Sequence, residues 1–150
     1  MRTRLERFSA GEEGFTLLEL LMVVLIIGIL ATIALPSFLN QKTKALNASA
    51  QSLTHTAQTA AEAYATDHNG SYTGLTSASL SQYEPTIQTA AGNGTAYVFA
   101  VTNASATGYT ITTAPATGNQ TFSVTRSNGL TTRTCTPTTG AQGGCTNGSW

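Results

Sequence analysis

The feature that most constrains this chain is an almost unbroken apolar run from Gly14 to Pro36, which contains one carboxylate, that of Glu19. The hydrocarbon core of a bilayer is about 30 Å thick and takes roughly 20 helical residues to cross. About fifteen large apolar side chains favour insertion by roughly 5 to 9 kcal/mol, whereas one acid near mid-bilayer costs about 3 kcal/mol. The run therefore predicts a membrane-spanning helix, and a charge retained in such a helix marks a functional site.

The residues before this run predict its orientation. Residues 1–14 contain three arginines, and basic residues beside an apolar segment favour the cytoplasmic side of a membrane. The bulk of the chain is therefore expected on the outer side. A secretory signal peptide cleaved after Ala31 or Ala34 is the alternative, but the apolar region of such a peptide is only about 7–15 residues long.

The segment Gly14–Glu19 (GFTLLE), followed by the apolar run and Pro36, resembles the processing site and N-terminal helix of type IV prepilins. This resemblance covers about residues 12–40. It implies that a membrane prepilin peptidase and methyltransferase removes residues 1–14 as a leader. The cut would fall between Gly14 and Phe15, and the new amine of Phe15 would be methylated.

Glu19 is the residue of this segment whose chemistry needs a partner. A lone carboxylate in hydrocarbon protonates or draws in water, whereas a nearby cation stabilises its charged form. Cleavage would create such a cation at Phe15. The resemblance implies that Glu19 pairs with the Phe15 amine of a neighbouring subunit and so sets the axial register of a filament. Pairing within one chain and a carboxylate that snorkels to the membrane edge are the alternatives.

Two residues are expected to weaken the apolar helix of residues 15–36. Pro36 removes one backbone hydrogen bond and kinks or locally opens a helix, and Gly28 is a second weak point. The resemblance to pilins implies that the segment at Pro36 melts when subunits pack into a filament. The alternative is that Pro36 ends the membrane helix, although the helical pattern resumes after it.

Residues 37–67 predict an amphipathic continuation, in one helix from about Phe15 to about Thr66. Apolar positions recur every seventh residue, and a second series follows four residues after each of the first. This spacing places one narrow stripe on a helix that packs on its own head domain, with a coiled coil as the alternative. The two series are Leu39, Leu46, Leu53 and Ala60, and Thr43, Ala50, Ala57 and Tyr64.

The rest of the chain predicts a connection and then a sheet, and hence an α+β fold. The turn signal Asn69-Gly70 ends the helix, and residues 68–95 read as a surface connection with a short helical turn around Ser77–Tyr83. In residues 96–150, four β-branched and aromatic segments predict an antiparallel meander. Its inward face is expected to carry Tyr97, Phe99, Tyr109, Ile111, Phe122 and Val124.

Cys135 and Cys145 both lie far downstream of the membrane segment. In an exported domain, two such cysteines favour a disulfide over a metal site, with a free thiol pair as the alternative. The pattern also resembles the disulfide-bounded C-terminal loop of many pilins. Closing a loop of this size contributes about 3 kcal/mol.

The titratable residues argue against an enzyme. No Asp, Glu or His follows Glu84, so a catalytic site could draw its acids and bases only from a few positions, and the two histidines are expected to be solvated. These positions are His55, Glu62, Asp67, His68 and Glu84. We expect no catalytic residue, cofactor or metal. Major pseudopilins of type II secretion share the N-terminal helix but typically carry a C-terminal calcium site. Calcium normally recruits carboxylates, and residues 85–150 have none, so the chain resembles a pilin more than a pseudopilin.

Charge adds one more exclusion: only 9% of residues are charged and the net charge is zero, so nucleic-acid binding is not predicted. The sequence thus favours a major pilin that enters the inner membrane as a single-pass precursor. Through an assembly platform it would form a homopolymeric surface pilus for adhesion, twitching motility or DNA uptake. The alternatives are a minor pilin or pseudopilin, and a monomeric membrane-anchored binding domain.

Overall fold

The structure, a computed structural model, describes residues 14–92, 95–138 and 141–150. The predicted leader, apart from Gly14, lies outside the described residues. The chain forms two compact units, one ending at Phe38 and the other comprising Leu39–Trp150, which we call the head. The expected α+β class is confirmed. The elements are α1 (Leu17–Asp67), α2 (Ser77–Tyr83), β1 (Ala96–Thr102), β2 (Gly108–Pro115), β3 (Thr121–Ser127), β4 (Leu130–Thr136), β5 (Ala141–Gln142) and β6 (Cys145–Thr146).

Helix α1 ends where the Asn-Gly signal predicts. Asn69 and Gly70 adopt positive φ values of 56° and 80°, and the Gly70 N–H donates to the carbonyl of Ala65 at 2.7 Å. This six-residue closure satisfies one of the carbonyls that every helix C-terminus leaves unpaired. The short helix α2 also forms at Ser77–Tyr83 as expected, with Thr76 as its N-cap.

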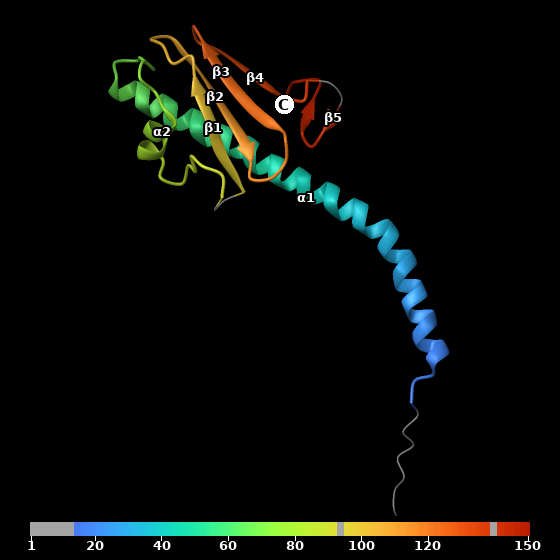
Figure 1. Ribbon diagram of the computed structural model, residues 1–150. Helices are drawn as coiled ribbons and strands as arrows, with labels where there is room; N and C mark the ends of the chain where they lie inside the picture. Colours follow the sequence, from blue (N-terminus) through green and yellow to red (C-terminus); the bar gives the residue numbers. More distant parts are fainter. Residues whose placement is uncertain (1–13, 93–94, 139–140) are drawn as a thin grey trace, which may run out of the picture. The chain divides into compact units, whose positions relative to one another are not determined.

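Strands β1 to β4 form an antiparallel meander in the order β1-β2-β3-β4, which confirms the predicted sheet. Figure 1 shows these strands side by side, next to the C-terminal part of α1. The hairpin between β3 and β4 turns at Asn128-Gly129, whose φ values of 49° and 84° suit the left-handed turn that this dipeptide favours. The second sheet, of β5 and β6, was not predicted.

The predicted stripe on the head part of α1 was partly wrong. Ala50, Ala57, Ala60 and Tyr64 are buried as expected, whereas Leu39 is exposed and Leu46 and Leu53 are only half-buried. The buried face is centred one residue later than the leucine series. Asn47 and Thr54, which directly follow Leu46 and Leu53, are buried more deeply than those leucines.

Burial of these two polar side chains is compensated by hydrogen bonds to the sheet side of the core. The Asn47 amide donates to the side-chain oxygen of Gln120. The Thr54 hydroxyl lies 2.6 Å from that of Thr113 and donates to the carbonyl of Ala50 at 2.9 Å. Buried polar groups are tolerated when they are hydrogen-bonded in this way.

The inward face of the sheet was predicted correctly in β2 and β3 and wrongly in β1. Tyr109, Ile111, Phe122 and Val124 are all buried, at 0–1% exposure. In β1, by contrast, Tyr97 is only half-buried and Phe99 is 62% exposed, while Val98 points inward at 1% exposure. The reason is the register, which places Val98 opposite the inward-facing Thr113 and introduces a bulge between Val98 and Ala100.

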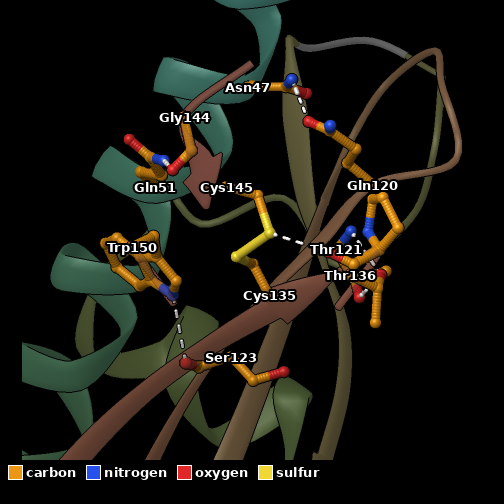
Figure 2. The surroundings of a disulfide bond; sticks show 11 residues. Asn47, Gln51, Gln120, Thr121, Ser123, Cys135, Thr136, Gly144, Cys145 and Trp150 are labelled. Carbon is orange, nitrogen blue, oxygen red and sulfur yellow. Dashed lines mark hydrogen bonds between the residues drawn. A yellow bond between two sulfur atoms is a disulfide. The ribbon is translucent and has the colours of Figure 1, made fainter. Parts of the chain in front are cut away.

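The predicted Cys135–Cys145 disulfide joins β4 to β6. It links residues 141–150, which we call the tail, to the rest of the head. Figure 2 shows this bond between α1 and the strands. The Gln51 side chain of α1 donates to the carbonyl of Gly144 at 3.0 Å. The indole of Trp150 packs on Phe122 with ring centroids 5.8 Å apart. The tail therefore closes the head at the β4 edge of the sheet.

Candidate assembly site

The N-terminal half of α1 presents apolar side chains without partners in the part of the chain that the structure describes. Every large apolar side chain from Phe15 to Leu39 is exposed, with values of 49–82%. α1 includes a window of mean hydropathy 2.8, long and apolar enough to cross a membrane, and none of that window is buried. Apolar surface of this extent marks contact with lipid or with other proteins.

Thr16 and Glu19 form a reciprocal cap at the start of α1. The Thr16 N–H donates to Glu19 Oε2 at 3.0 Å, and the Glu19 N–H donates to Thr16 Oγ1 at 3.2 Å. The Thr16 hydroxyl also donates to Glu19 Oε2 at 2.9 Å. This is the capping box of a Thr followed three residues later by a Glu. Its spacing is visible in the sequence, but the cap was not predicted from it.

The cap directs the Glu19 carboxylate back to the first residues of the helix. Gly14 and Phe15 lie immediately before α1 and are exposed, and a Cβ added at Gly14 would meet nothing within 4 Å. The structure therefore brings three of the predicted site residues, Gly14, Phe15 and Glu19, to one end of α1. There the carboxylate accepts hydrogen bonds from Thr16, the residue next to Phe15.

The other predicted site residues do not belong to this cluster. Gly28 and Pro36 are inside α1, which is helical through both, so the helix does not end at Pro36. Their opening in a filament stays a prediction. Cys135 and Cys145 belong to the head.

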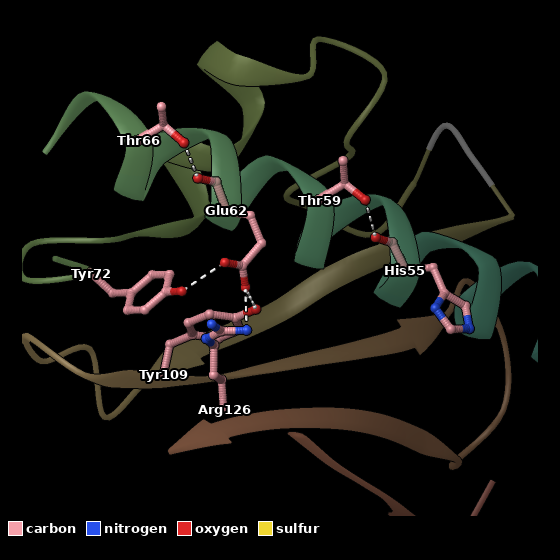
Figure 3. A network of polar contacts seen from close by, with 7 residues as sticks. All are labelled: His55, Thr59, Glu62, Thr66, Tyr72, Tyr109 and Arg126. Carbon is pink, nitrogen blue, oxygen red and sulfur yellow. Dashed lines mark hydrogen bonds and ion pairs between the residues drawn. The ribbon is translucent and has the colours of Figure 1, made fainter. Parts of the chain in front are cut away.

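A second polar cluster, which we call the Glu62 cluster, lies in the head (Figure 3). One carboxylate oxygen of Glu62 accepts a hydrogen bond from the Tyr72 hydroxyl at 2.7 Å. The other accepts from the Tyr109 hydroxyl at 3.1 Å and pairs with Arg126 Nη1 at 3.2 Å. The carboxylate thus joins α1 to the connection after it, to β2 and to β3.

The tyrosines of this cluster are held in their neutral form. Burial, the hydrogen bond to Glu62 and the charge of that carboxylate raise the pKa of Tyr72 to about 12. The pKa of Tyr109 is also raised, first by burial and then by the charge and hydrogen bond of Glu62. The arrangement suits structural cross-linking, because a neutral phenol donates its hydrogen bond and a phenolate cannot.

The remaining candidate acids and bases each have local partners. The ring of His55 lies edge-on to Trp150 at 5.3 Å, and that of His68 stacks on Tyr64 at 3.9 Å, so the two exposed histidines are not simply solvated. Asp67 accepts a hydrogen bond from Tyr83, and Glu84 accepts from Thr86. Across the described ranges, no three His, Cys, Asp or Glu residues are grouped so that they could hold a metal ion.

Comparison with known proteins points to the same end of the chain. The sequence model of the prokaryotic N-terminal methylation motif matches residues 10–35. Over 36 residues the chain is 58% identical to the type IV major pilin protein PilA of Myxococcus xanthus (strain DK1622). This match covers 24% of the chain and only 16% of the length of that relative. No solved structure matches the chain.

The matched residues contain Gly14, Phe15, Glu19 and the apolar half of α1 up to Leu35. The motif match ends at residue 35, before the head, whose sheet and disulfide rest on the structure alone. The chain therefore carries the prokaryotic N-terminal methylation motif, and its predicted resemblance to type IV pilins is confirmed for the N-terminal segment.

Proposed function

We propose that this protein is a structural subunit, the major pilin, of a type IV pilus. It enters the inner membrane through the apolar half of α1, with its head on the outer side. A prepilin peptidase cuts between Gly14 and Phe15, and the Phe15 amine is methylated. An assembly platform then stacks many copies into an extracellular homopolymer, with helices at the centre and heads outside.

One observation carries this proposal: the residues that match the methylation motif include the N-terminal part of α1, whose large apolar side chains are all exposed. Such a surface needs lipid around it before assembly and other helices afterwards, because exposure of this much apolar area to water is unfavourable. A subunit that leaves the membrane by packing helix against helix meets both conditions.

The geometry of Glu19 supports the role proposed for it in assembly. Its carboxylate already lies at the helix end that cleavage would expose, where Thr16 holds it. The Phe15 amine produced by cleavage would be a cation, and an ammonium–carboxylate bond is stronger in the low dielectric of packed helices than in water. In our proposal that amine belongs to the neighbouring subunit, which fixes the step between subunits.

The proposed partners are copies of the chain, the processing enzyme and the membrane platform. Adhesion, twitching motility and DNA uptake would be properties of the fibre and its motors. We propose no catalytic or cofactor role.

The test is the mass of the mature protein purified from its membrane or fibre. We expect a chain that begins at Phe15 and carries one extra methyl group. Gly14→Leu should retain the leader, because the bulky side chain obstructs the cleavage site. Gly11→Leu, which changes a glycine three residues earlier, should be processed normally and is the matched control. A mature chain that starts at Met1, or after Ala31 or Ala34, would contradict the proposal.

A minor pilin or a type II secretion pseudopilin is the second candidate, because both would share the motif and α1. Residues 85–150 contain no carboxylate side chain for calcium, and a disulfide closes the C-terminal segment, which favours the pilin. Abundance separates major from minor: this chain should be the main component of isolated fibres. A monomeric anchor would instead keep residues 1–14 and form no fibre.

A further inference from the structure

The face of the four-stranded sheet that points away from α1 carries a regular array of hydroxyl groups. Ile111 and Val124 face the core, so their strand neighbours face outward. Cross-strand pairing places these neighbours in two ranks over β2, β3 and β4. We call this set the hydroxyl grid: Thr110, Thr125 and Thr132 form the first rank, and Thr112, Ser123 and Thr134 form the second.

The register makes the spacing of the hydroxyl grid repeat in two directions. Neighbouring strands lie about 4.8 Å apart, and alternate residues along a strand are about 6.7 Å apart. Thr102 of β1 pairs with Thr110 and extends the first rank to all four strands. A repeating array of this kind suits a ligand that is itself a repeat of similar units.

The hydroxyl groups are organised but retain hydrogen-bonding capacity. Thr110 lies 3.1 Å from Thr125, and Thr112 lies 2.8 Å from Ser123, measured between hydroxyl oxygens. Each such contact uses one O–H and one lone pair. Since a hydroxyl has one donor and two acceptor sites, each pair keeps one O–H and several lone pairs for a partner. All six residues of the hydroxyl grid are partly or largely exposed.

Two aromatic rings and a hollow adjoin the hydroxyl grid. Tyr97 and Phe99 lie on β1 with ring centroids 6.4 Å apart, and Phe99 is 62% exposed. At the other end of β2, a hollow of about 280 Å³ is bordered by Thr110, Thr125 and Asn103. Arg126 also borders the hollow, with its guanidinium paired to Glu62. Hydroxyl, amide and aromatic groups therefore meet on one surface.

The residues of the hydroxyl grid, with Tyr97 and Phe99, include no acid or base that is charged at neutral pH. A nucleic acid or an acidic polymer would require cations at such a surface. A polymer of neutral sugars matches it instead: sugar hydroxyls exchange hydrogen bonds with the threonines, and the slightly positive C–H face of a sugar ring stacks on the negative face of an aromatic ring. The geometry points to a binding face for a neutral polysaccharide on the outer side of the head.

This inference does not rest on fibre assembly, so it is tested on the intact chain in a sugar-free detergent. The probe is insoluble amorphous cellulose, with carboxymethyl cellulose as an anionic polymer on the same backbone. We expect the protein to sediment with cellulose and not to bind carboxymethyl cellulose. Binding should be unchanged between about 0.05 and 0.5 M salt, because screening weakens only interactions between charges.

Two variants and two matched controls connect binding to the face. Thr112→Val with Thr125→Val removes hydroxyls and keeps β-branched shape, and Phe99→Ala removes the exposed ring. Each should weaken retention about tenfold and leave the melting temperature of the head unchanged. Thr59→Val and Leu39→Ala, both on α1, change similar exposed groups away from this face, and both should bind like the parent chain.

Three outcomes would overturn the inference. The first is no retention on cellulose by the parent chain. The second is retention that falls steeply with salt, which would indicate a charged site. The third is equal retention by all variants, or a change in self-association in place of cellulose binding, which would assign the face to a second copy of the chain.

Discussion

Glu62 is the residue on which four segments of the head converge. It contributes one carboxylate, and Tyr72, Tyr109 and Arg126 each reach that carboxylate from a different segment. The Arg126 guanidinium also lies 5.7 Å from the centre of the Tyr72 ring. Because each donor has found an acceptor, the polar cluster stabilises one arrangement of helix, connection and strands.

Glu62→Gln should lower the free energy of unfolding of the head by about 1–3 kcal/mol, because an amide is a weaker acceptor than a carboxylate and leaves Arg126 unpaired. Urea unfolding followed by circular dichroism measures this. Glu84→Gln is the matched control, since the half-buried Glu84 side chain bonds to the nearby Thr86 and to no other segment in the described residues, and its unfolding midpoint should not move. Equal midpoints for Glu62→Gln and the parent would contradict the role of the cluster.

The same cluster predicts a loss of stability at high pH. The pKa of Tyr72 is raised to about 12 in the folded head, whereas a tyrosine in an unfolded chain titrates near pH 10. Its contribution to stability is therefore complete below about pH 10 and lost as pH rises toward 12. Phenolate absorbance should show Tyr72 and Tyr109 titrating late, and Glu62→Gln should bring that titration to lower pH. Titration of all tyrosines near pH 10 in the folded protein would refute this.

At the scale of elements, the head part of α1 packs on the sheet through small residues. Ala50, Ala57 and Ala61 are fully buried, so strand side chains approach the helix backbone closely. The Thr113 hydroxyl of β2 reaches the carbonyl of Ala50 itself at 2.9 Å, next to its contact with Thr54. Small side chains here permit hydrogen bonds between helix and sheet that larger ones would block.

Thr54→Val should destabilise the head by about 1 kcal/mol, because it removes a buried hydroxyl that bonds to Ala50 and Thr113. Thr56→Val is its control two residues later, where the hydroxyl bonds only to the carbonyl of Ser52 within α1. We expect a shift of thermal midpoint for the first variant and none for the second. A larger effect of Thr56→Val would show that the buried contact does not contribute.

The link between β4 and β6 predicts sensitivity to reductant. Cys135 and Cys145 are ten residues apart, and opening such a loop costs about 2–4 kcal/mol of stability. Reduction should lower the melting temperature. It should also shift the emission of the single tryptophan, Trp150, to longer wavelength as its ring leaves Phe122. The double variant Cys135→Ser and Cys145→Ser should melt low with or without reductant. An unchanged melting temperature after complete reduction would contradict this.

At the scale of the whole molecule, the chain joins two units with opposite relations to water. The head buries a core of its own, whereas the described part of the unit ending at Phe38 exposes every large apolar side chain from Phe15 to Phe38. A monomer of this kind needs lipid or other subunits to cover the apolar part of α1. The proposed function follows from this need and from the position of Glu19 on the same helix.

Glu19→Ala should abolish fibres while leaving processed protein in the membrane, because the proposed partner of the Phe15 amine is lost. Glu19→Gln separates charge from capping, since an amide oxygen can still accept from Thr16 but carries no charge. We expect Glu19→Gln to form no fibres either. Sheared fibres, examined by electron microscopy and immunoblotting, provide the measurement. Abundant fibres from Glu19→Gln would mean that the carboxylate acts as a helix cap and not as an ion partner.

What the sequence alone determined are the properties that reside in neighbouring residues. Continuous hydropathy predicted the apolar helix, Asn69-Gly70 its end, alternation the strands and two cysteines the disulfide. The Gly14–Glu19 segment indicated the methylation motif for the same reason, while cleavage after Gly14 stays a prediction. The Thr16–Glu19 cap was equally local and could have been found.

Only the tertiary structure decided which residues of α1 and β1 face the core. Asn47 and Thr54 are buried because Gln120 and Thr113, more than fifty residues away, supply their hydrogen bonds. Val98 replaced the larger Phe99 in the core because pairing with β2 set the register of β1. The partners of Glu62 likewise come from three later segments. Periodicity in a sequence reports that one face is buried, but the burial of a polar group depends on partners that only the folded chain brings together.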